Sequence, residues 1–388
     1  MSDPALHHAS PAFRVLIAGG GVAALETAFA LQELAPDRVS CTMLAPGPDF
    51  TVRAQTITEP FSRGIPEHYP LSLLAKAAGA ELVAGSLTGV DASRRVACTA
   101  EGSEIAYDAL LIATGAIATT RYAHTTTVDD GRMDALLHGL VQDIEEGYVS
   151  RLAIVVPAPP PWPLPAYELA LMTSERAWDM QTEMTVTLLT PERRPLEAFG
   201  EAVSDALGQL LRERHIELIT SAYCDVPESK TVLVHPSGRV VDADRIIALP
   251  QLRGPQIDGL PCDGGGFIPV DRFGRVPGVD RVWAAGDVTD SSIKQGGMAA
   301  GVADVAAHGI ARLAGAPVDV RPYVPLLQGV LFTGGKPRYL RAQPTWSENA
   351  GESIWTELDQ ASAPPKVSAR YLMPRLKELA AHSASTTV

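Results

Sequence analysis

Three consecutive glycines at positions 19–21 constrain the fold of this chain more than any other feature of its sequence. They stand between the apolar run 13–18, which predicts a buried strand, and the stretch Val22–Leu34, which predicts a helix. Gly19 permits a tight turn, Gly21 lets a pyrophosphate approach the backbone, and the small Ala24 lets the helix pack close to the sheet. Free N–H groups and the positive end of the helix dipole then face the phosphates. The sequence therefore predicts a dinucleotide site with contacts from Gly19, Gly21, Val22 and Ala23.

Two further strand ends in the chain share this design. Residues 109–116 form an apolar run that ends in a small, flexible turn, and residues 282–287 repeat it far downstream. In this order the three motifs resemble the signatures of the two-dinucleotide-domain flavoproteins, the pyridine nucleotide-disulfide oxidoreductase superfamily, over about residues 13–340. The resemblance implies that FAD binds with its pyrophosphate at the first glycine turn. It also implies contacts to the cofactor from Thr114, Gly115, Gly286 and Asp287, the last of these at the ribityl chain.

The composition excludes several classes of protein. The 388 residues include 32 basic and 45 acidic side chains, a net charge of −13, so nucleic acid is excluded as a partner. No stretch approaches the roughly 20 apolar residues of a membrane span, and the first ten residues do not resemble a signal peptide. We expect a cytoplasmic protein without a metal site, in which His7 and His8 belong to a polar tail.

The order of the motifs predicts the domain organisation. We expect an α/β fold with two Rossmann-like, three-layer ββα dinucleotide-binding domains, the second inserted in the first, plus a short C-terminal segment. The expected FAD domain comprises residues 11–120 and 235–318, the second domain residues 121–234, and the C-terminal segment residues 319–388. In the second domain, a strand–helix–strand unit is expected at 151–156, 166–180 and 184–190, with further helices at 140–147 and 195–215. Later, we expect a helix at 298–313, a strand pair at 332–340, a polar mobile stretch at 343–365 and a helix at 371–379.

The loop of the second strand–helix–strand unit lacks the glycine motif of relatives that use NADH. Residues 157–165 read Pro-Ala-Pro-Pro-Pro-Trp-Pro-Leu-Pro. Because proline has no N–H, this loop cannot present the ring of amide donors that a pyrophosphate needs. We therefore expect no NAD(P)H binding of the usual kind. Arg193 and Arg194, at the next strand end, are then surface charges rather than ligands of a 2′-phosphate.

Within the superfamily, this loop resembles that of the sulfide:quinone oxidoreductases and flavocytochrome c sulfide dehydrogenases. These proteins also replace the second glycine motif by a proline-containing loop and an aromatic–Glu pair, here Tyr167 and Glu168, and keep a short C-terminal segment. In quinone-reducing relatives that segment covers the flavin and anchors to membrane. Here a single helix with Arg375 and Lys377 would give peripheral attachment at most. Packing on the protein's own body or on a homodimer mate is the preferred role.

The cysteines separate this chain from the redox-active members of the superfamily. Cys41, Cys98, Cys224 and Cys262 are widely spaced, so the dithiol of the disulfide reductases is missing. The catalytic cysteines that flank the flavin in sulfide-oxidising relatives are missing too, which argues against oxidation through a persulfide. We expect Cys41 and Cys98 to be core residues, and Cys262 to lie in a polar loop as the one cysteine worth testing for reactivity.

The adenosine end of the cofactor also differs from the usual pattern. The acidic residue expected about 20 residues beyond the glycines, to bind ribose, is replaced by Ala45. Arg53 is a candidate to stack on adenine or to reach a phosphate, with a solvated loop cation as the alternative. Asp49 is a weaker substitute for the missing carboxylate.

A second helix N-terminus is expected near the flavin. It follows Lys294 and Gln295, and its dipole would stabilise negative charge on the pyrimidine side of the ring. Lys294 would add a full positive charge, unless it is a solvated lysine at a helix start. Trp162 and Tyr167 are the residues we expect to line the donor side, with ordinary packing as the alternative.

These features predict an FAD-dependent oxidoreductase that resembles the sulfide:quinone reductase branch without its cysteines. Its redox partners would be a small donor and a quinone-like or protein acceptor. One alternative is an NAD(P)H-dependent flavin oxidoreductase of the ferredoxin-reductase or type II NADH dehydrogenase kind. The other is a binding or assembly module that uses FAD as a structural staple.

Overall fold

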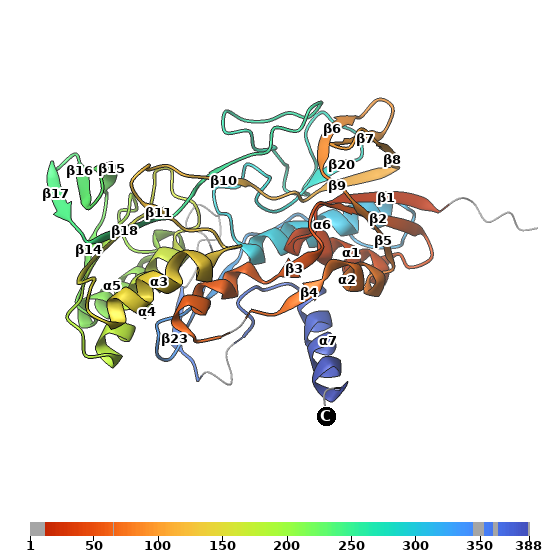
Figure 1. The fold of residues 1–388 in the computed structure, drawn as a ribbon. Helices are drawn as coiled ribbons and strands as arrows, with labels where there is room; N and C mark the ends of the chain where they lie inside the picture. The colour runs from red at the N-terminus through yellow and green to blue at the C-terminus, as the bar shows by residue number, and fades with distance from the viewer. Residues whose placement is uncertain (1–11, 65, 344–352, 360–363, 387–388) are drawn as a thin grey trace, which may run out of the picture.

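The computed structural model describes residues 12–64, 66–343, 353–359 and 364–386, and Figure 1 shows their arrangement. The N-terminal tail with His7 and His8 lies outside this range. A five-stranded parallel sheet forms the centre of the first domain, in the order β20-β9-β1-β2-β5. Its strands are β1 (Phe13–Ala18), β2 (Val39–Ala45), β5 (Ala80–Ala84), β9 (Ala109–Ile112) and β20 (Val282–Ala284).

Two different layers cover the faces of this sheet. Helices α1 (Val22–Leu34), α2 (Leu71–Ala77) and α6 (Gly296–Leu313) bury one face through alanines and leucines. On the other face lies an antiparallel sheet of β6 (Leu87–Asp91), β7 (Val96–Thr99) and β8 (Glu104–Ala106). This three-layer ββα arrangement confirms the predicted fold class.

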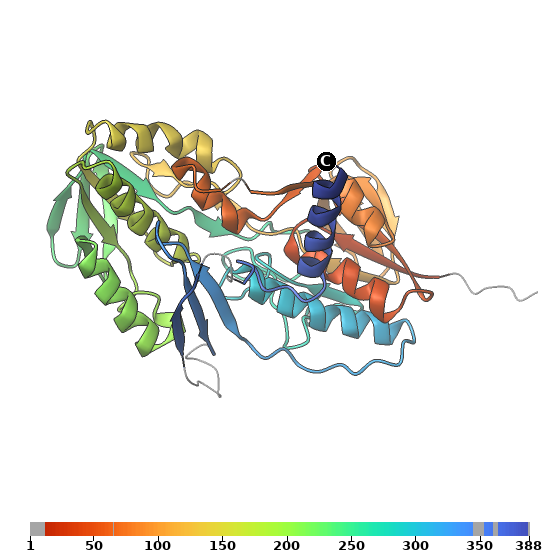
Figure 2. The same cartoon turned by 90° about the horizontal axis from the view of Figure 1, so that it is seen from below.

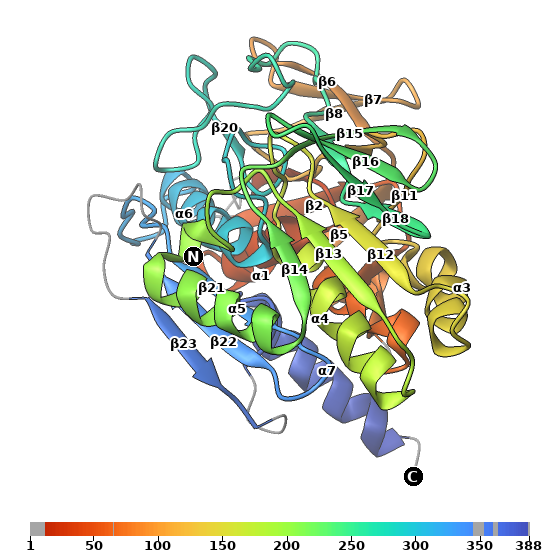
Figure 3. The same cartoon turned by 90° about the vertical axis from the view of Figure 1, so that its left-hand side faces the viewer.

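The second domain repeats the architecture, as Figure 3 shows. Its parallel sheet has the order β11-β18-β12-β13-β14, formed by Thr126–Thr127, Arg245–Ala248, Arg151–Val155, Thr185–Leu189 and Ile216–Ile219. One face carries helices α3 (Met133–Glu145), α4 (Leu164–Asp179) and α5 (Glu201–Glu213). The other carries the antiparallel strands β15 (Tyr223–Glu228), β16 (Thr231–His235) and β17 (Arg239–Asp242).

Several expected boundaries need correction. The second domain does not end at residue 234, because β18 returns to its sheet and pairs in parallel with β12. The helix expected at 140–147 begins earlier, at Met133. The single helix expected at 195–215 is divided into a 3-10 turn, Glu197–Phe199, and α5, because Gly200 takes a φ of +86° between them.

The C-terminal segment joins the two domains. Strands β21 (Leu327–Leu331), β22 (Arg338–Ala342) and β23 (Ile354–Glu357) form an antiparallel sheet beside the helices of the second domain (Figure 2). The strand pair therefore flanks residues 332–337 instead of occupying 332–340. Strand β23 lies within the stretch expected to be mobile, of which 344–352 and 360–363 are outside the described residues. The last helix, α7 (Leu372–Thr386), is longer than the predicted 371–379.

Short elements connect these layers. Among them are β3 (Asp49–Thr51), the 3-10 helix η1 (Arg53–Phe61), β4 (His68–Pro70), β10 (Ile117–Thr119) and β19 (Gln251–Arg253). No helix in the described parts of the chain is long and apolar enough to cross a lipid bilayer.

Candidate flavin site

The three predicted motifs meet at one edge of the first sheet. Because β20, β9 and β1 are neighbouring parallel strands, their carboxyl ends lie side by side. The segments that follow these ends hold the glycine turn 19–21, the pair Thr114 and Gly115, and the pair Gly286 and Asp287. Ligands of open α/β sheets bind outside the carboxyl ends of the strands, so this edge is the candidate site.

The glycines at the two outer positions of the turn, 19 and 21, differ in what surrounds them. Gly19 has a φ of +137°, and a Cβ on it would lie 2.2 Å from the carbonyl oxygen of Ala113. Any side chain there would collide with the backbone that follows β9. A Cβ on Gly21, in contrast, would meet nothing within 4 Å. Gly21 is exposed, so space is open in front of the helix that it begins.

The N-terminus of α1 is suited to an anion. Within the described residues no side chain caps Gly21, and the first turn of α1 contains no acidic residue. The first N–H groups of an uncapped helix have no intrahelical acceptor and carry the positive end of the dipole. The turn thus offers the backbone donors that a pyrophosphate requires, at Gly21, Val22 and Ala23.

A second helix N-terminus converges on the same place. Gly286 has a φ of +83°, and a Cβ on it would lie 3.4 Å from the Cβ of Ala23 and 3.5 Å from that of Ala299. It therefore sits between the first turns of α1 and α6. Asp287 follows directly and is half-buried. Burial raises the pKa of its carboxyl, against the opposing positive charges of Lys294 and Arg53.

Arg53 and Asp130 add charge to this region. Arg53 begins η1 and is exposed, and its charge acts on both Asp287 and Asp130. Asp130 lies in the loop before α3, reachable by solvent but enclosed by protein, and this desolvation raises the pKa of its carboxyl. The positive charges near it are Arg53 and Lys366. Sequence reasoning missed Asp130, because an acidic residue in a loop carries no distinguishing local signal.

The side chains of Lys294 and Gln295 both make contacts with other groups of the protein. Lys294 donates to the carbonyl oxygen of Thr289, and its Nζ lies 3.7 Å from the centroid of the Phe267 ring. Burial lowers the pKa of Lys294 to about 8, although nearby carboxylates oppose this. The side chain of Gln295 caps α6 by accepting from the N–H of Met298 at 2.9 Å. What Gln295 can offer a cofactor is therefore its backbone.

The start of α4 contrasts with the start of α1. Pro163 stands at its N-cap and Pro165 in its first turn, so two of the N–H groups that could face a ligand do not exist. At the next strand end, Arg194 pairs with Glu201 at 2.6 Å and with Asp205. This agrees with the interpretation of the arginines as surface charges. The second sheet thus lacks the amide cradle present on the first.

Of the two aromatic residues expected on the donor side, one is in the core. Tyr167 is fully buried, and its hydroxyl donates to Oε2 of Glu192 at 2.7 Å. It therefore packs inside the second domain and does not face an open pocket. Trp162 is half-buried and packs against Phe199, with ring centroids 5.8 Å apart. For Tyr167 the structure shows the packing alternative, whereas a place of Trp162 on the donor side stays a prediction.

Glu192 is expected to make the stability of the second domain depend on pH. Burial raises its pKa from 4.5 to about 7, so the neutral form favours the fold below pH 4.5 and this contribution is lost as pH rises to about 7. Relative to Glu192→Gln, we expect the wild type to lose about 3 kcal/mol of unfolding free energy over this window. Urea unfolding of both proteins at pH 4.5 to 8 measures the difference. Parallel pH curves would show that the carboxyl does not titrate there.

Sequence reasoning also missed a buried ion pair beside the proline loop. Glu168 of α4 is 1% exposed and accepts from the Nζ of Lys366, which is 8% exposed and comes from the C-terminal segment. The same Oε1 accepts from the N–H of Phe332 at 2.8 Å, and Lys366 Nζ lies 3.8 Å from the Phe332 ring centroid. The charge of Lys366 also acts on Asp130, so the pair borders the candidate site.

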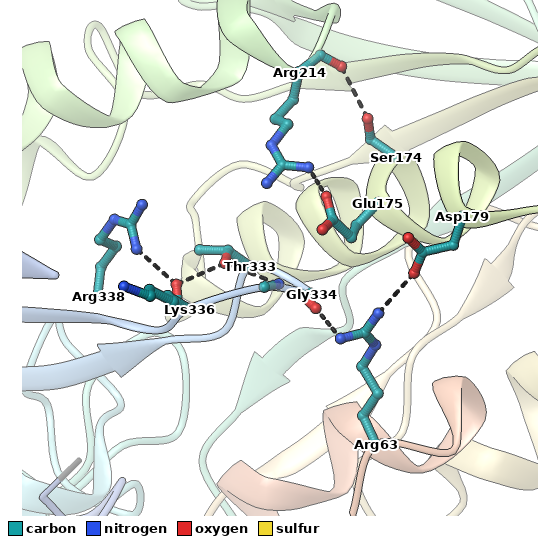
Figure 4. Close-up of polar contacts among 10 residues, drawn as sticks. Arg63, Ser174, Glu175, Asp179, Arg214, Thr333, Gly334, Lys336 and Arg338 are labelled. Atoms are coloured by element: carbon teal, nitrogen blue, oxygen red, sulfur yellow. Dashed lines mark hydrogen bonds and ion pairs between the residues drawn. The ribbon is translucent and has the colours of Figure 1, made fainter. Parts of the chain in front are cut away.

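Figure 4 shows a second junction between α4 and the C-terminal segment. Arg63, which follows η1, donates to the carbonyl oxygen of Gly334 and to Asp179 Oδ2, the latter at 3.0 Å. Glu175 pairs with Arg214. It also lies close to Gly334, because a Cβ added to Gly334 would be 2.6 Å from the Cβ of Glu175. Three regions of the chain are thereby fixed around the β21–β22 turn.

The cysteines follow the expectations for Cys41 and Cys262, whereas Cys98 is less buried than the core position expected for it. Cys41 is buried in β2, Cys98 is half-buried in β7, and Cys224 is buried in β15 of the outer sheet of the second domain. Cys262 is exposed in a loop. Burial raises the pKa of both the Cys41 and the Cys224 thiol to about 12, so neither provides a thiolate near neutral pH. Among the described residues, no cluster of potential metal ligands occurs.

Comparison with known proteins supports the assignment from geometry. Residues 166–304 match the family described as pyridine nucleotide-disulphide oxidoreductase. This match covers about a third of the chain. Together with the fold, it identifies the protein as an FAD-dependent oxidoreductase. None of the curated proteins matches the chain significantly in sequence.

Solved structures with the same fold come from several kinds of enzyme. A sulfide:quinone oxidoreductase from the hyperthermophilic bacterium Aquifex aeolicus has a TM-score of 0.80 and 21% identity, over 89% of this chain and 87% of that one. A ferredoxin reductase from Rhodopseudomonas palustris has a TM-score of 0.65 and 16% identity, over 85% and 82%. A NAD-dependent persulfide reductase from A. fulgidus has a TM-score of 0.62 and 17% identity, over 86% and 65%.

The residues at the carboxyl edge of the first sheet fit FAD. The donors of the α1 turn suit the pyrophosphate, the open space at Gly21 accommodates it, and Asp287 is placed to accept hydrogen bonds from a polyol. Ala45 ends β2 in a buried position where the usual ribose-binding carboxylate would stand. We therefore expect recognition of the adenosine end to differ from the common pattern.

Proposed function

We propose that this flavoprotein transfers electrons from a small donor other than NAD(P)H to a quinone-like acceptor. When bound, FAD supplies the two-electron chemistry. In this proposal the turns at Gly21 and Gly286 hold the cofactor, and the N-termini of α1 and α6 provide a positive field for the negative charge that develops during reduction.

The observation that carries the proposal is the contrast between the two sheets. The first sheet ends in a glycine turn with free amides, whereas the corresponding loop of the second contains six prolines within residues 157–165. A hydride carrier such as NADH needs a second amide cradle for its own pyrophosphate. This supports a donor that reaches the flavin without such a cradle.

A pocket at the C-terminal segment supports the choice of acceptor. Its volume is about 490 Å³, and Gln328, Tyr339, Val367 and Met373 are among its lining residues. Two of these also touch the start of α6: Gln328 accepts from Gln295 Nε2 at 2.9 Å, and a Cβ on Gly296 would lie 3.1 Å from Val367. The pocket thus borders the start of α6, the helix that we propose points toward the flavin. An aromatic and a thioether side chain suit a flat, partly apolar ring.

Asp130 is the residue that we assign to proton transfer on the donor side. A donor that gives up two electrons generally also releases protons, and a general base must lie beside it. The carboxylate of Asp130 is open to solvent and raised in pKa, and the charges of Arg53 and Lys366 act on it. Its raised pKa suits uptake of a proton from the donor.

The proposal predicts how the purified holoprotein responds to reductants. We expect NADH and NADPH, mixed anaerobically with the yellow protein, to leave its flavin absorbance unchanged. We expect the photoreduced protein to be reoxidised by decylubiquinone with saturating kinetics. Stopped-flow absorbance measures both reactions, with dithionite as the control for a reducible flavin.

Each contrary outcome points to a different function. Prompt bleaching by NADH would identify an NAD(P)H-dependent oxidoreductase and would contradict the role assigned to the proline loop. A flavin that dithionite reduces but decylubiquinone does not reoxidise would exclude a quinone acceptor and favour a protein acceptor. A flavin that no oxidant or reductant turns over would mark a cofactor with a structural role.

A further inference from the structure

A buried carboxylate of α1 holds the first turn of the last helix. Glu26 is 1% exposed although it stands among alanines, leucines and Phe29. Its Oε1 accepts from the N–H of Arg370 at 2.7 Å and from that of Tyr371 at 3.0 Å. Its Oε2 accepts from Tyr371 at 3.1 Å and from Leu372 at 2.7 Å. Both oxygens are therefore bonded to backbone groups that lie some 345 residues away in the sequence.

This arrangement explains why a charged group can be buried in an apolar helix. An unpaired carboxylate in a core is costly, whereas one that accepts several N–H bonds is stabilised. The donors are the groups at the beginning of α7 that have no acceptor within that helix. Glu26 thus replaces the N-cap of α7 from another element, and α7 is fixed to α1 through it.

The same stretch of chain is held at its other end by the second domain. We call residues 364–371 the strap. Lys366 of the strap pairs with Glu168 of α4, and both side chains are buried. One carboxylate from each domain therefore holds the strap, and Val367, beside Lys366, packs against the start of α6 at Gly296.

The strap and the first turns of α7 form most of the wall of the 490 Å³ pocket. From the strap come two prolines, Val367, Ser368 and Ala369, and from α7 come Met373, Pro374 and Lys377. The opposite wall is the β21–β22 hairpin, with Tyr339. The width of the pocket thus depends on where the strap lies, and the position of its end depends on Glu26.

We propose that Glu26 is a positioning residue for the acceptor pocket. It keeps the strap against α6 and so determines how tightly a quinone-like ring binds, without itself touching the acceptor. The inference rests on the proposed function for the nature of the acceptor. The anchoring of the strap rests on the hydrogen bonds alone.

Hydrogen exchange and acceptor binding test the proposal in the FAD-bound protein. In Glu26→Leu we expect the amides of residues 370–372 to exchange at least tenfold faster, as backbone bonds lost to solvent do. The apparent dissociation constant for decylubiquinone, from reoxidation of the photoreduced protein, is expected to rise roughly tenfold, the effect of one lost positioning interaction. The limiting rate of reoxidation should stay within about twofold of the wild-type value. The flavin midpoint potential should equal that of the wild type within experimental error.

Two further variants test the same hydrogen bonds without a substitution in the hydrophobic core. Arg370→Pro removes one N–H donor at an exposed residue, and Arg370→Ala is its matched control. We expect the proline variant alone to weaken acceptor binding and speed the exchange of its neighbours. Glu33→Gln, an exposed acid on the same helix, serves as the control for a charge lost from α1.

The outcomes separate this inference from the proposed function. If Glu26→Leu folds and binds FAD but its exchange at 370–372 and its decylubiquinone affinity match the wild type, Glu26 is not a positioning residue. Equal weakening by Arg370→Ala and Arg370→Pro would have the same meaning. If the wild-type protein itself is not reoxidised by decylubiquinone, the proposed function is wrong. The role of Glu26 in the acceptor pocket is then wrong as well.

Discussion

Lys366→Met is expected to lower the free energy of unfolding by about 3 to 5 kcal/mol, the usual cost of leaving one partner of a buried ion pair alone. Glu168 and Lys366 are 1% and 8% exposed, so water cannot replace the lost partner. Burial raises the pKa of Glu168 and lowers that of Lys366, while their attraction acts in the opposite direction on each. Each buried charge is therefore stabilised only by the presence of the other.

A double-mutant cycle measures this dependence. We expect Glu168→Gln to be destabilising as well, because it leaves the Lys366 ammonium buried, and we expect the double variant to be more stable than either single one. Urea unfolding of the three variants and the wild type at pH 7 gives the coupling. Additive losses would mean that the two side chains do not depend on each other.

The surface pair Arg94 and Glu104 is the matched control for this cycle. Their Nη2 and Oε2 atoms lie 2.8 Å apart, but the side chains are 57% and 50% exposed. Solvent screens such a pair, so Arg94→Met should leave the urea midpoint of unfolding almost unchanged. The comparison isolates burial as the cause of the larger loss at Lys366.

Local patterns in the sequence were sufficient for the first strand, the first helix and the turns at the carboxyl edge of the first sheet. Strand β1 and helix α1 have the bounds that were predicted, because an apolar run, a glycine turn and a small-residue helix are all defined by neighbours in sequence. The three strand-end motifs could be brought together in advance because parallel strands share one carboxyl edge. Proline content likewise predicted the missing amides at the start of α4.

The rest of the site depends on contacts between residues far apart in the chain. Glu168 and Lys366 are separated by 198 positions, and Glu26 lies more than 340 positions from its donors. Periodicity and spacing carry no information about such pairs. The one available signal was a single acid within the apolar stretch 22–31, which has no partner on its own helix. Tyr167 was misplaced for a related reason, because its partner Glu192 follows the next strand.

Gly21→Ala is expected to weaken FAD binding roughly 10- to 100-fold while leaving the fold intact, since one extra methyl group in a tightly packed contact costs about 1 to 3 kcal/mol. The methyl would meet nothing within 4 Å in the protein, and the φ of −89° suits any residue. Its only obstacle is therefore a ligand that occupies the space in front of α1. The unfolding free energy of the cofactor-free variant should lie within about 1 kcal/mol of the wild type.

Substitutions at two other glycines serve as comparisons for Gly21→Ala. Gly19→Ala should impair folding itself, because its Cβ would lie 2.2 Å from the Ala113 oxygen. Gly139→Ala, at an open position in α3, should stabilise the protein by about 0.5 to 1 kcal/mol and leave FAD affinity unchanged. Fluorescence titration of the cofactor-free proteins with FAD measures the affinities. Equal affinity in Gly21→Ala and the wild type would mean that the pyrophosphate does not lie against this turn, because no group of the described residues lies within 4 Å of the added methyl.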